Sequence, residues 1–500
     1  MTDHSGLDQR IGLCLASQEI LERIRNGRIT TSGNVHSRIQ PSSFEPTLSG
    51  EVFMLDTETD GLFQPRRDQT VYQTLLELPL NRRRSASLAG GYELKKGFTY
   101  LLPLEERISM EGLVCVRSSP KSSTGRVFLN TRMVADYNPY LDEIGTNSCD
   151  KMLQLWLVVQ PLAFNVVVRP GLSLNQLRFM TSYDAQLTPS EIDEEMKISP
   201  LLFTGADCET AAPHIINSDG LEIHLDLTGK ATQGIIGLRA RHNPESVDMS
   251  KSNLYKAEEF FEPLKGEGKM KMVRGEYYLL STKEVLNVPS HLDVEVKRYS
   301  SSRFTGPLDF AGFVDNGFIG DLVLEPRSDE LSSIVLEDGM PIGSLMVFRT
   351  SVPDKLYGQE SGAHYQRQCG PKTAKFFKPF DFAMAAKNYD KLSRMVLVQD
   401  ADVLLQYNDE GFKFLAPHIE KDLRDDIQRG FFQSRYDCED DQRLLQIIPY
   451  VLLFGPDENI FVYQRADKIK DYGDQRLFGK SSIGLGGHII PADCPSYLES

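Results

Sequence analysis

The 500-residue chain contains no Cys-x-x-Cys pair, and its seven cysteines are scattered from Cys14 to Cys494. Cysteines without paired spacing are typical of reduced thiols, so the pattern predicts a cytoplasmic protein. The first residues, Met1–Asp8, contain neither a basic nor an apolar segment, and we therefore expect no secretory signal. The most apolar stretch, Leu153–Val168, is interrupted by polar residues and a proline, so it is too short and too polar to span a bilayer.

Basic residues are the minority among the charged ones. The chain has 55 Lys and Arg against 70 Asp and Glu, which gives a formal net charge of −15. Such an acidic protein is not expected to bind nucleic acid or an anionic membrane, and a phosphorylated ligand would need a local cluster of cations. The hydrophobic fraction of 40% is typical of a soluble globular protein, and the length predicts two to four domains.

A set of short segments occurs twice in the same order. Gly97–Leu102 matches Gly275–Leu280, 178 residues later, and Arg169–Leu177 resembles Glu337–Leu345. Chance similarity between short β segments is the alternative, but the shared order favours a duplicated unit. The other matching pairs are Glu106 with Glu284, the strand-like runs Leu113–Val116 and Leu292–Val296, and the Ser-rich turns Ser122–Arg126 and Ser300–Arg303.

Within each unit, runs of Val, Ile, Leu, Phe and Tyr alternate with Gly, Pro, Asn and Asp turns, which predicts a mainly β fold. Helical patterns are few: Ser17–Arg25 has the spacing of a capped helix, and Pro189–Met196 that of a short one. The expected parts are a first β unit at residues 1–185, an acidic connector at 186–213, a second β unit at 214–380 and a module of mixed helix and strand at 381–500.

One stretch carries side chains that suit chemistry on a polyanion. Lys121–Arg126 places a lysine, three hydroxyl groups and an arginine within six residues. Cations, hydroxyl groups and backbone N–H groups can converge there on phosphate or ribose oxygens. The same composition is also typical of a polar turn between strands, and these residues alone leave the two interpretations about even.

A second, distant stretch contains two acidic residues. Asp315 precedes Asn316 and Gly317, a preferred hairpin turn, and could belong to a simple turn alone. Glu325 lies in the apolar run Leu322–Pro326, where a carboxylate is either exposed by the pleat or buried at a cost. Burial would raise the pKa of Glu325 and make it a candidate proton shuttle.

No zinc site is expected. His418 and Glu420 have the His-x-Glu spacing of zinc-dependent base-modifying enzymes, but no Pro-Cys-x-x-Cys follows them. We therefore interpret His418 as an ordinary histidine, and no residue is assigned as a metal ligand.

Three segments together resemble one enzyme family. Pro120–Arg126, Val314–Glu325 and Gly362–Gly370 are similar to motifs of the dCTP deaminases of the dUTPase superfamily, above all the fused, two-repeat bacterial type. The resemblance runs from about residue 39 to residue 380. It implies two tandem dUTPase-like units, each a distorted β-barrel of jelly-roll type. Two further elements fit, the opening motif Ile39–Glu45, in which Glu45 stands where Asp is usual, and the strand-turn-strand element Arg169–Phe179.

The resemblance also implies roles for individual residues. Glu325 matches the glutamate that activates the water attacking C4 of cytosine and passes the proton to the leaving ammonia. Ser122 and Arg126 match the hydroxyl and guanidinium groups that position this water and the base. Mg²⁺ is expected to bind through the triphosphate rather than through protein ligands. The remaining matches are substrate contacts: Lys121, where single-repeat members have arginine, with Ser123 beside it; Ala311 at the base; Asp315 at the deoxyribose; and Tyr365 and Gln368 in the segment that closes over the triphosphate.

The two units differ at these positions. Aligning Pro161 with Pro326 places Gln160 where the first unit should carry its glutamate, and an amide cannot shuttle protons. Tyr299 stands where the second unit should carry its equivalent of Ser122. The expected working site therefore combines Lys121, Ser122 and Arg126 of the first unit with Asp315 and Glu325 of the second.

The last module resembles the start of a Nudix hydrolase domain. Counting from Gly487, the first glutamate position of that family's metal-binding helix is Asp493, and the rest of the helix would begin after Ser500. We expect no Nudix hydrolysis, with the module either cut short or vestigial, and a simple Gly-rich turn is the alternative. The resemblance rests on Leu444–Phe454, Tyr463–Arg465 and Phe478–Ile489.

The expected reaction is hydrolytic deamination of dCTP to dUTP and ammonia by a water that Glu325 activates, without zinc. One alternative is a dUTP diphosphatase, or a bifunctional enzyme that continues to dUMP, because Asp315 also fits the aspartate that activates water in dUTPases. A second alternative is a non-catalytic nucleotide-binding regulatory protein. The expected partners are dCTP, dTTP as a candidate regulator, and further copies of the chain in a homo-oligomer.

Overall fold

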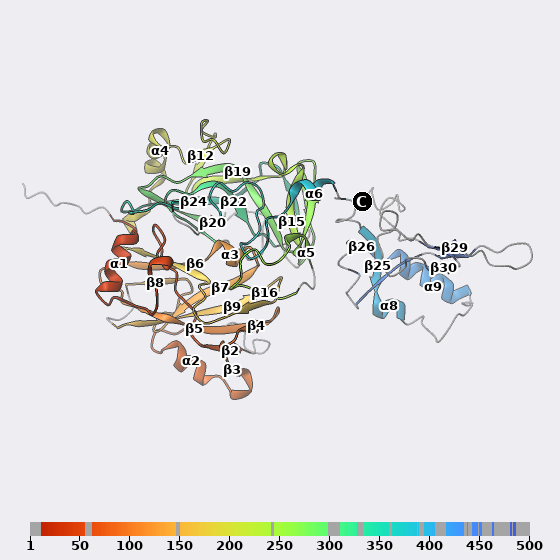
Figure 1. The fold of residues 1–500 in the computed structure, drawn as a ribbon, viewed down its shortest axis with the longest axis horizontal. Helices are drawn as coiled ribbons and strands as arrows, with labels where there is room; N and C mark the ends of the chain where they lie inside the picture. Colours follow the sequence, from red (N-terminus) through yellow and green to blue (C-terminus); the bar gives the residue numbers. More distant parts are fainter. Residues whose placement is uncertain are drawn as a thin grey trace, which may run out of the picture. The chain divides into compact units, whose positions relative to one another are not determined.

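The computed structural model contains two compact units, residues 1–387 and 388–500. In the first unit, Figure 1 shows one group of strands in orange and yellow and a second group in green. The predicted mainly β class is confirmed. The residues that the structure describes are 12–55, 63–146, 151–241, 245–298, 311–327, 334–359 and 363–387 in the first unit, and 389, 395–405, 417–434, 438, 443–448, 450–452, 463–464, 481–482 and 484–486 in the second.

The first group of strands, called repeat 1, forms three sheets. Its strands are β1 (Ile29–Thr30), β2 (Glu51–Leu55), β3 (Arg83–Ser87), β4 (Tyr92–Leu94), β5 (Thr99–Ile108), β6 (Cys115–Pro120), β7 (Leu129–Ala135), β8 (Glu143–Gly145), β9 (Leu153–Pro161), β10 (Val166–Val168) and β11 (Asn175–Met180). The largest sheet has the order β3-β2-β5-β9-β7, with β1 on β5, and a second has the order β11-β6-β8. The third sheet pairs β10 with β4 and with β16 (Val247–Asp248) of the second group, so it joins the two groups.

The second group, called repeat 2, is dominated by one large sheet. Its strands are β12 (Leu202–Phe203), β13 (Ile216–Asn217), β14 (Gly220–Asp226), β15 (Ile235–Ala240), β16, β17 (Phe261–Lys265), β18 (Lys269–Met272), β19 (Tyr278–Asn287), β20 (Leu292–Arg298), β21 (Phe313–Val314), β22 (Ile319–Leu324), β23 (Ile334–Glu337) and β24 (Pro341–Arg349). The sheet has the order β17-β15-β19-β14-β24-β20-β21, and β22 pairs with β19 beside it. β9 and β19 are almost wholly buried, which explains their continuous apolar sequences.

Helices in the first unit are short and lie at the edges of the sheets. The predicted helix Ser17–Arg25 is confirmed as α1; its N-cap residue is Ala16, whose N–H donates to the Glu19 carboxylate at 2.8 Å. The short helix predicted at Pro189–Met196 is present as α4 (Pro189–Ile198). The remaining helices there are α2 (Val71–Glu77), α3 (Ser122–Gly125), α5 (Ala257–Phe260) and α6 (Phe382–Lys387).

The two repeats share the register of their main strand pairs. Leu102 faces Leu157 across β5 and β9, and Leu280 faces Leu324 across β19 and β22. From repeat 1 to repeat 2, residue numbers therefore rise by 178 between β5 and β19 and by 167 between β9 and β22. The same shifts hold beyond an irregularity that interrupts both ladders at the same place. The matched segments at residues 97–106 and 275–284 thus belong to equivalent strands. The predicted match of Ser300–Arg303 lies outside the described residues.

This register corrects the predicted partner of Glu325. Because Leu324 corresponds to Leu157, Glu325 corresponds to Val158, and the predicted correspondence with Gln160 is wrong. Aligning the two prolines misplaced the strands by two residues. Repeat 1 therefore carries a buried apolar side chain, 2% exposed, where repeat 2 carries its acid.

Each repeat has its own apolar core. In repeat 2 the core runs between β14, β19, β22 and β24 and includes Tyr365. In repeat 1 a smaller core covers one face of β5 and β9, where Trp156 and Val158 pack with Val71 and Leu75 of α2. The helix α2 thus covers this face of the repeat 1 sheet.

The second unit is described only in part. Its strands pair in the orders β26-β25-β27, β28-β31 and β29-β30. His418, interpreted as an ordinary histidine, lies on α9. Gly487 and Asp493 lie outside the described residues, so the Nudix resemblance stays a prediction. The elements are β25 (Met395–Asp400), α8 (Ala401–Leu405), α9 (Pro417–Gln428), β26 (Phe431–Ser434), β27 (Leu444–Gln446), β28 (Tyr450–Leu452), β29 (Tyr463–Gln464), β30 (Ser481–Ser482) and β31 (Gly484–Gly486).

Candidate active site

A pocket of about 480 Å³ lies in the first unit, between residues of repeat 1 and residues of repeat 2. The first repeat contributes the turn after β6, and the second contributes the strand β22 and the segments on either side of it. All nine predicted site residues line this pocket: Lys121, Ser122, Ser123, Arg126, Ala311, Asp315, Glu325, Tyr365 and Gln368.

The turn after β6 is the short helix α3, and the backbone fixes it firmly. The Lys121 carbonyl accepts a hydrogen bond from the Thr124 N–H at 2.8 Å, and the Thr124 hydroxyl donates to the Leu174 carbonyl at 2.8 Å. The Arg126 N–H donates to the Ser122 carbonyl at 3.1 Å. Figure 1 shows α3 between the two groups of strands. The helix and its two flanking residues therefore place the hydroxyl groups and cations of repeat 1 next to residues of repeat 2.

Arg126 is held by a segment far along the chain. Its Nη2 donates to the Gln368 Oε1 at 2.9 Å, and its Nη1 donates to the Lys372 carbonyl at 3.0 Å. The guanidinium also lies 3.9 Å from the centre of the Tyr365 ring. Burial lowers the pKa of Arg126, and the tyrosine and Glu325 oppose this shift. Residues 363–377, called the strap, thus fix the guanidinium in one orientation.

Glu325 is a buried acid beside this arginine. Only 6% of the residue is exposed, and burial raises the pKa of Glu325 to about 8, although Arg126 acts to lower it. Gly125 packs directly on the carboxylate, since a Cβ at that position would lie 3.2 Å from the Glu325 Oε1. Among the residues that the structure describes, none donates a hydrogen bond to its buried Oε2. This oxygen can accept a proton from a bound water or substrate.

Asp315 is a second buried acid in the pocket. Its Oδ1 accepts hydrogen bonds from the Ser42 hydroxyl at 3.1 Å and from the Ser43 hydroxyl at 3.4 Å. Burial raises the pKa of Asp315, while Arg178 and the hydroxyl of Ser42 lower it. The predicted opening motif of repeat 1 therefore positions an acid of repeat 2. Ala311, at the edge of this segment, precedes Gly312, whose N–H donates to the Ser119 Oγ at 2.7 Å.

One end of the pocket is cationic. Lys121 forms an ion pair with Glu45, and Lys375 of the strap has a pKa lowered by burial and by Lys121. Burial and the nearby lysines likewise lower the pKa of His364. The Ser123 Oγ lies 2.5 Å from the Tyr365 hydroxyl. Converging positive charge of this kind suits a polyphosphate.

The sequence analysis missed His364 and Lys375. Both lie on the strap, which β22 holds in place: the Asp321 N–H donates to the Gln368 carbonyl at 3.2 Å, and the Gly370 N–H donates to the Asp321 Oδ2 at 2.9 Å. Burial raises the pKa of Asp321 to about 6. Four basic or imidazole side chains within twelve residues, His364 to Lys375, were a usable sequence signal.

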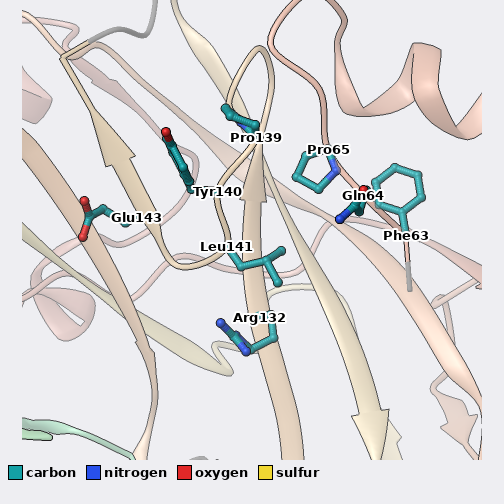
Figure 2. Close-up of a pocket in the computed structure, with 8 residues that line it drawn as sticks. All are labelled: Phe63, Gln64, Pro65, Arg132, Pro139, Tyr140, Leu141 and Glu143. Atoms are coloured by element: carbon teal, nitrogen blue, oxygen red, sulfur yellow. The ribbon is translucent and has the colours of Figure 1, made fainter. Parts of the chain in front are cut away.

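A second hollow of about 870 Å³ lies on repeat 1 and contains none of the predicted residues (Figure 2). Its charged lining residues are Arg132 of β7 and Glu143 of β8. Both side chains are exposed by more than a third, and Arg132 is paired with Asp142. This hollow therefore lacks the buried, convergent groups of the pocket between the repeats.

Neither a membrane helix nor a metal cluster is present in the described part of the chain. No described helix is long and apolar enough to cross a membrane. No group of three or more His, Cys, Asp or Glu side chains is placed to hold a metal ion among the same residues.

Comparison with known proteins gives consistent matches to both repeats. The model of the 2'-deoxycytidine 5'-triphosphate deaminase (DCD) N-terminal domain matches residues 11–183, and that of the DCD C-terminal domain matches residues 199–377. A protein named dCTP deaminase, dUMP-forming, from Streptomyces avermitilis is 38% identical over 110 residues, which are 21% of this chain and 58% of the relative. A protein of the same name from Streptomyces coelicolor is 39% identical over 110 residues, again 21% of this chain and 58% of the relative.

The chain thus spans less than two thirds of the length of these relatives. A match to a solved structure covers a larger share of this chain. The crystal structure of 2'-deoxycytidine 5'-triphosphate deaminase from Agrobacterium tumefaciens has a TM-score of 0.62 and 26% sequence identity, and the match covers 69% of this chain and 100% of that one. The predicted dUTPase-like fold of the two repeats agrees with this match.

Proposed function

This chain belongs to the 2'-deoxycytidine 5'-triphosphate deaminase family, and on that premise we propose that it hydrolyses dCTP to dUTP and ammonia. The observation that carries the proposal is the burial of Glu325 against Gly125 and Arg126, which raises the pKa of this carboxyl group to about 8. A general base is most effective when its pKa lies near the working pH. Burial alone brings the pKa of Glu325 close to a neutral working pH.

The chemical step needs one group that first accepts a proton and then donates it. In the proposed step, ionised Glu325 removes a proton from water while the water oxygen bonds to C4 of cytosine. The resulting tetrahedral carbon carries the new hydroxyl and the amino group. Glu325 delivers this first proton to N3, which holds the electron pair of the former C4–N3 double bond. Glu325 then takes the proton of the new hydroxyl and transfers it to the amino group, so the C4–N bond breaks and ammonia leaves as the C4 carbonyl forms. Buried surroundings strengthen every electrostatic contact in this step.

The other pocket residues supply position and charge. Arg126, fixed by its two hydrogen bonds to the strap, stabilises the negative charge that develops on the attacking oxygen, and Ser122 orients the water. Asp315 accepts a hydrogen bond from a deoxyribose hydroxyl, and the backbone at Ala311 contacts the base. The remaining proposed contacts are to the triphosphate, from Lys121, Ser123, Tyr365, Gln368, His364 and Lys375.

Mg²⁺ is proposed to enter with the substrate. Four carboxylates line the pocket, those of Glu45, Asp315, Glu325 and Asp354, and among the described residues no three His, Cys, Asp or Glu side chains are placed together to hold a metal ion. The pocket therefore suits an ion that the triphosphate itself carries, and the chain's own lysines hold the phosphate oxygens.

A direct assay tests the proposal. Purified protein is incubated with dCTP and Mg²⁺, ammonia is measured by a coupled enzyme, and nucleotides are separated by anion exchange. Equal amounts of dUTP and ammonia support it. Tight dCTP binding without ammonia release would refute it and leave a nucleotide-binding regulatory protein.

A second candidate is supported by the names of the relatives. Both Streptomyces proteins are called dUMP-forming, which indicates that a diphosphatase step follows deamination in them. Under this alternative, the same assay yields dUMP and pyrophosphate, and added dUTP is consumed as well. Accumulation of dUTP as the final product would exclude it.

A further inference from the structure

A buried ion pair joins the two repeats beneath the pocket. Arg178 of β11 lies 3.1 Å from the Oδ1 of Asp293 of β20, and both side chains are 0% exposed. The guanidinium also donates to the Val294 carbonyl at 3.3 and 3.4 Å and lies 4.1 Å from the centre of the Phe313 ring. Neither residue lines the pocket, so neither contacts a bound nucleotide directly.

This pair lies next to the acid in the pocket. Val294 of β20 faces Val314 of β21, so Asp293 and Asp315 flank this pair at the same end of the ladder. The Ser42 hydroxyl donates to Asp315 at 3.1 Å, and it also lowers the pKa of Asp293. Burial raises the pKa of Asp293 to about 7, Arg178 lowers it, and Asp315 raises it. Arg178 is in turn the largest charge acting on Asp315. The charge of one guanidinium therefore acts on two buried carboxylates.

Other charged or titratable groups face this cluster from the neighbouring elements. They are Glu45, which raises the pKa of Asp315; Glu295 of β20, which raises the pKa of Asp293; Arg117 of β6, which pairs with Glu295 at 3.2 Å; and Tyr357, whose own pKa Asp315 raises.

The duplication provides an internal comparison for the pair. Arg178 faces Arg117 across β6 and β11, and Met346 faces Glu295 across β20 and β24. Ser118 faces Leu177 across β6 and β11, and the equivalent pair in repeat 2 is Val296 and Leu345 across β20 and β24. Residue numbers therefore rise by 178 from β6 to β20 and by 168 from β11 to β24. The equivalents of Arg178 and Asp293 are therefore Met346 and Cys115.

Met346 and Cys115 belong to an apolar cluster with Cys14 and Phe348. The fold therefore accepts uncharged side chains at these two positions. Buried ion pairs seldom add stability over well-packed apolar groups, so packing alone does not explain the charged version. The charged pair Arg178 and Asp293 lies next to Asp315 of the pocket.

Resting on the proposed function, we infer that Arg178 and Asp293 are positioning residues: Asp293 holds the guanidinium of Arg178 next to Asp315, and Arg178 favours the ionised form of Asp315, which accepts a hydrogen bond from the deoxyribose. An ionised Asp315 is the stronger acceptor. Arg178 favours this form because a nearby opposite charge stabilises a carboxylate. Asp293 is protonated below about pH 7 and then bears no charge that could act on Asp315. The pH dependence of dCTP binding should therefore depend on Arg178.

The two single substitutions should act differently. Asp293→Asn replaces a carboxyl group that is protonated below about pH 7, and the amide can keep the contact with Arg178, so the acid side of the dCTP binding curve should stay close to the parent's. Arg178→Met removes the cation, so Asp315 becomes protonated at higher pH and binding weakens earlier. A shift of one pH unit changes the dissociation constant of Arg178→Met about tenfold on the acid side.

Calorimetric titration with dCTP and Mg²⁺ from pH 5 to pH 9 measures this effect. All variants carry Glu325→Gln as well, which removes turnover and the ionisation of Glu325 from the data. The matched control is R239M/E262Q, which removes another buried ion pair of repeat 2, 2.6 Å long, whose members do not line the pocket. The control should lower the thermal stability and leave the pH dependence of binding unchanged.

A binding curve that moves to higher pH for Arg178→Met, while that of Asp293→Asn stays close to the parent's, supports the inference. Should Arg178→Met fail to fold, R178M/D293C copies the apolar pair that the chain already packs elsewhere, and its curve should move to higher pH because Arg178 is lost. A folded Arg178→Met or R178M/D293C variant that keeps the parent's pH dependence overturns the inference. Failure of the proposed function is distinguishable, since it appears in the unmodified chain as dCTP binding without ammonia.

Discussion

Replacing Glu325 by glutamine should have two opposite effects on the protein. The amide keeps the shape of the carboxyl group but cannot transfer protons. General acid–base catalysis contributes about 10² to 10⁴ in rate, so kcat should fall by at least about 10²-fold. Binding of dCTP should change little, because the proposed role of Glu325 concerns the chemical step.

The same substitution should stabilise the fold. The pKa of Glu325 is raised from 4.5 to about 8 by burial, so as the pH rises the unfolded chain releases this proton first. Stability is therefore lost progressively between pH 4.5 and pH 8, and at pH 7 the loss is about 3 kcal/mol. Glutamine removes this loss. For a unit of this size, about 3 kcal/mol raises the melting temperature by roughly 4 °C.

Melting curves at pH 4.5 and pH 7, together with single-turnover kinetics, test both effects. The melting temperatures of the parent and Glu325→Gln should agree at pH 4.5 and differ at pH 7. The matched control is Glu262→Gln, another buried glutamate of repeat 2, which should lose stability by leaving Arg239 without its carboxylate and should keep its activity. A Glu325→Gln variant with a tenth or more of the parent's kcat refutes the assigned role.

Further predictions concern pH, charge and stoichiometry. Because Glu325 must be ionised to act as a base, kcat/KM should fall about tenfold for each pH unit below 8, and a flat profile from pH 6 to pH 8 would contradict this role. Lys375→Met should raise KM for dCTP about tenfold but not KM for deoxycytidine, whereas Lys378→Met at an exposed position should change neither. Arg126→Lys, which loses the paired contacts to the strap, should lower kcat/KM about 10²-fold in steady-state assays. Titration should find one dCTP per chain, and two would show that repeat 1 also binds nucleotide.

The duplicated β architecture was predictable because its signals are local. Repeated glycine turns followed by apolar runs mark β5 and β19, and the structure places these strands in the same register. The partner of Glu325 was not predictable in the same way. Sequence alignment used a proline as its anchor, whereas backbone hydrogen bonds define which residues are equivalent. These bonds make Val158 the equivalent of Glu325, two residues before the expected Gln160.

The site was predictable only as far as its motifs reach. Residues in and next to α3, and on either side of β22, could be named from the sequence, and the structure brings them into one pocket. Lys375 and His364 were missed because their contribution depends on the path of the strap, which hydrogen bonds to Asp321 determine. The helix α2 was missed although Thr70 and Gln73 form a capping box that the sequence displays.

The helix α2 also explains why, among the described residues, the site forms on repeat 2 and not at the equivalent face of repeat 1. In repeat 2, the face that carries Glu325 receives α3 from repeat 1, with Gly125 packed on the carboxylate. In repeat 1, the equivalent face carries Val158, and α2 covers it with Val71 and Leu75.

An acid at position 158 would be buried under α2 away from any substrate, which costs several kcal/mol. Conversely, a pocket at that face would require α2 to leave its apolar contacts, including the stacked rings of Tyr72 and Trp156. The apolar residue and the covering helix are therefore mutually consistent, and together they leave the acid, the arginine and the cationic end in the pocket between the repeats.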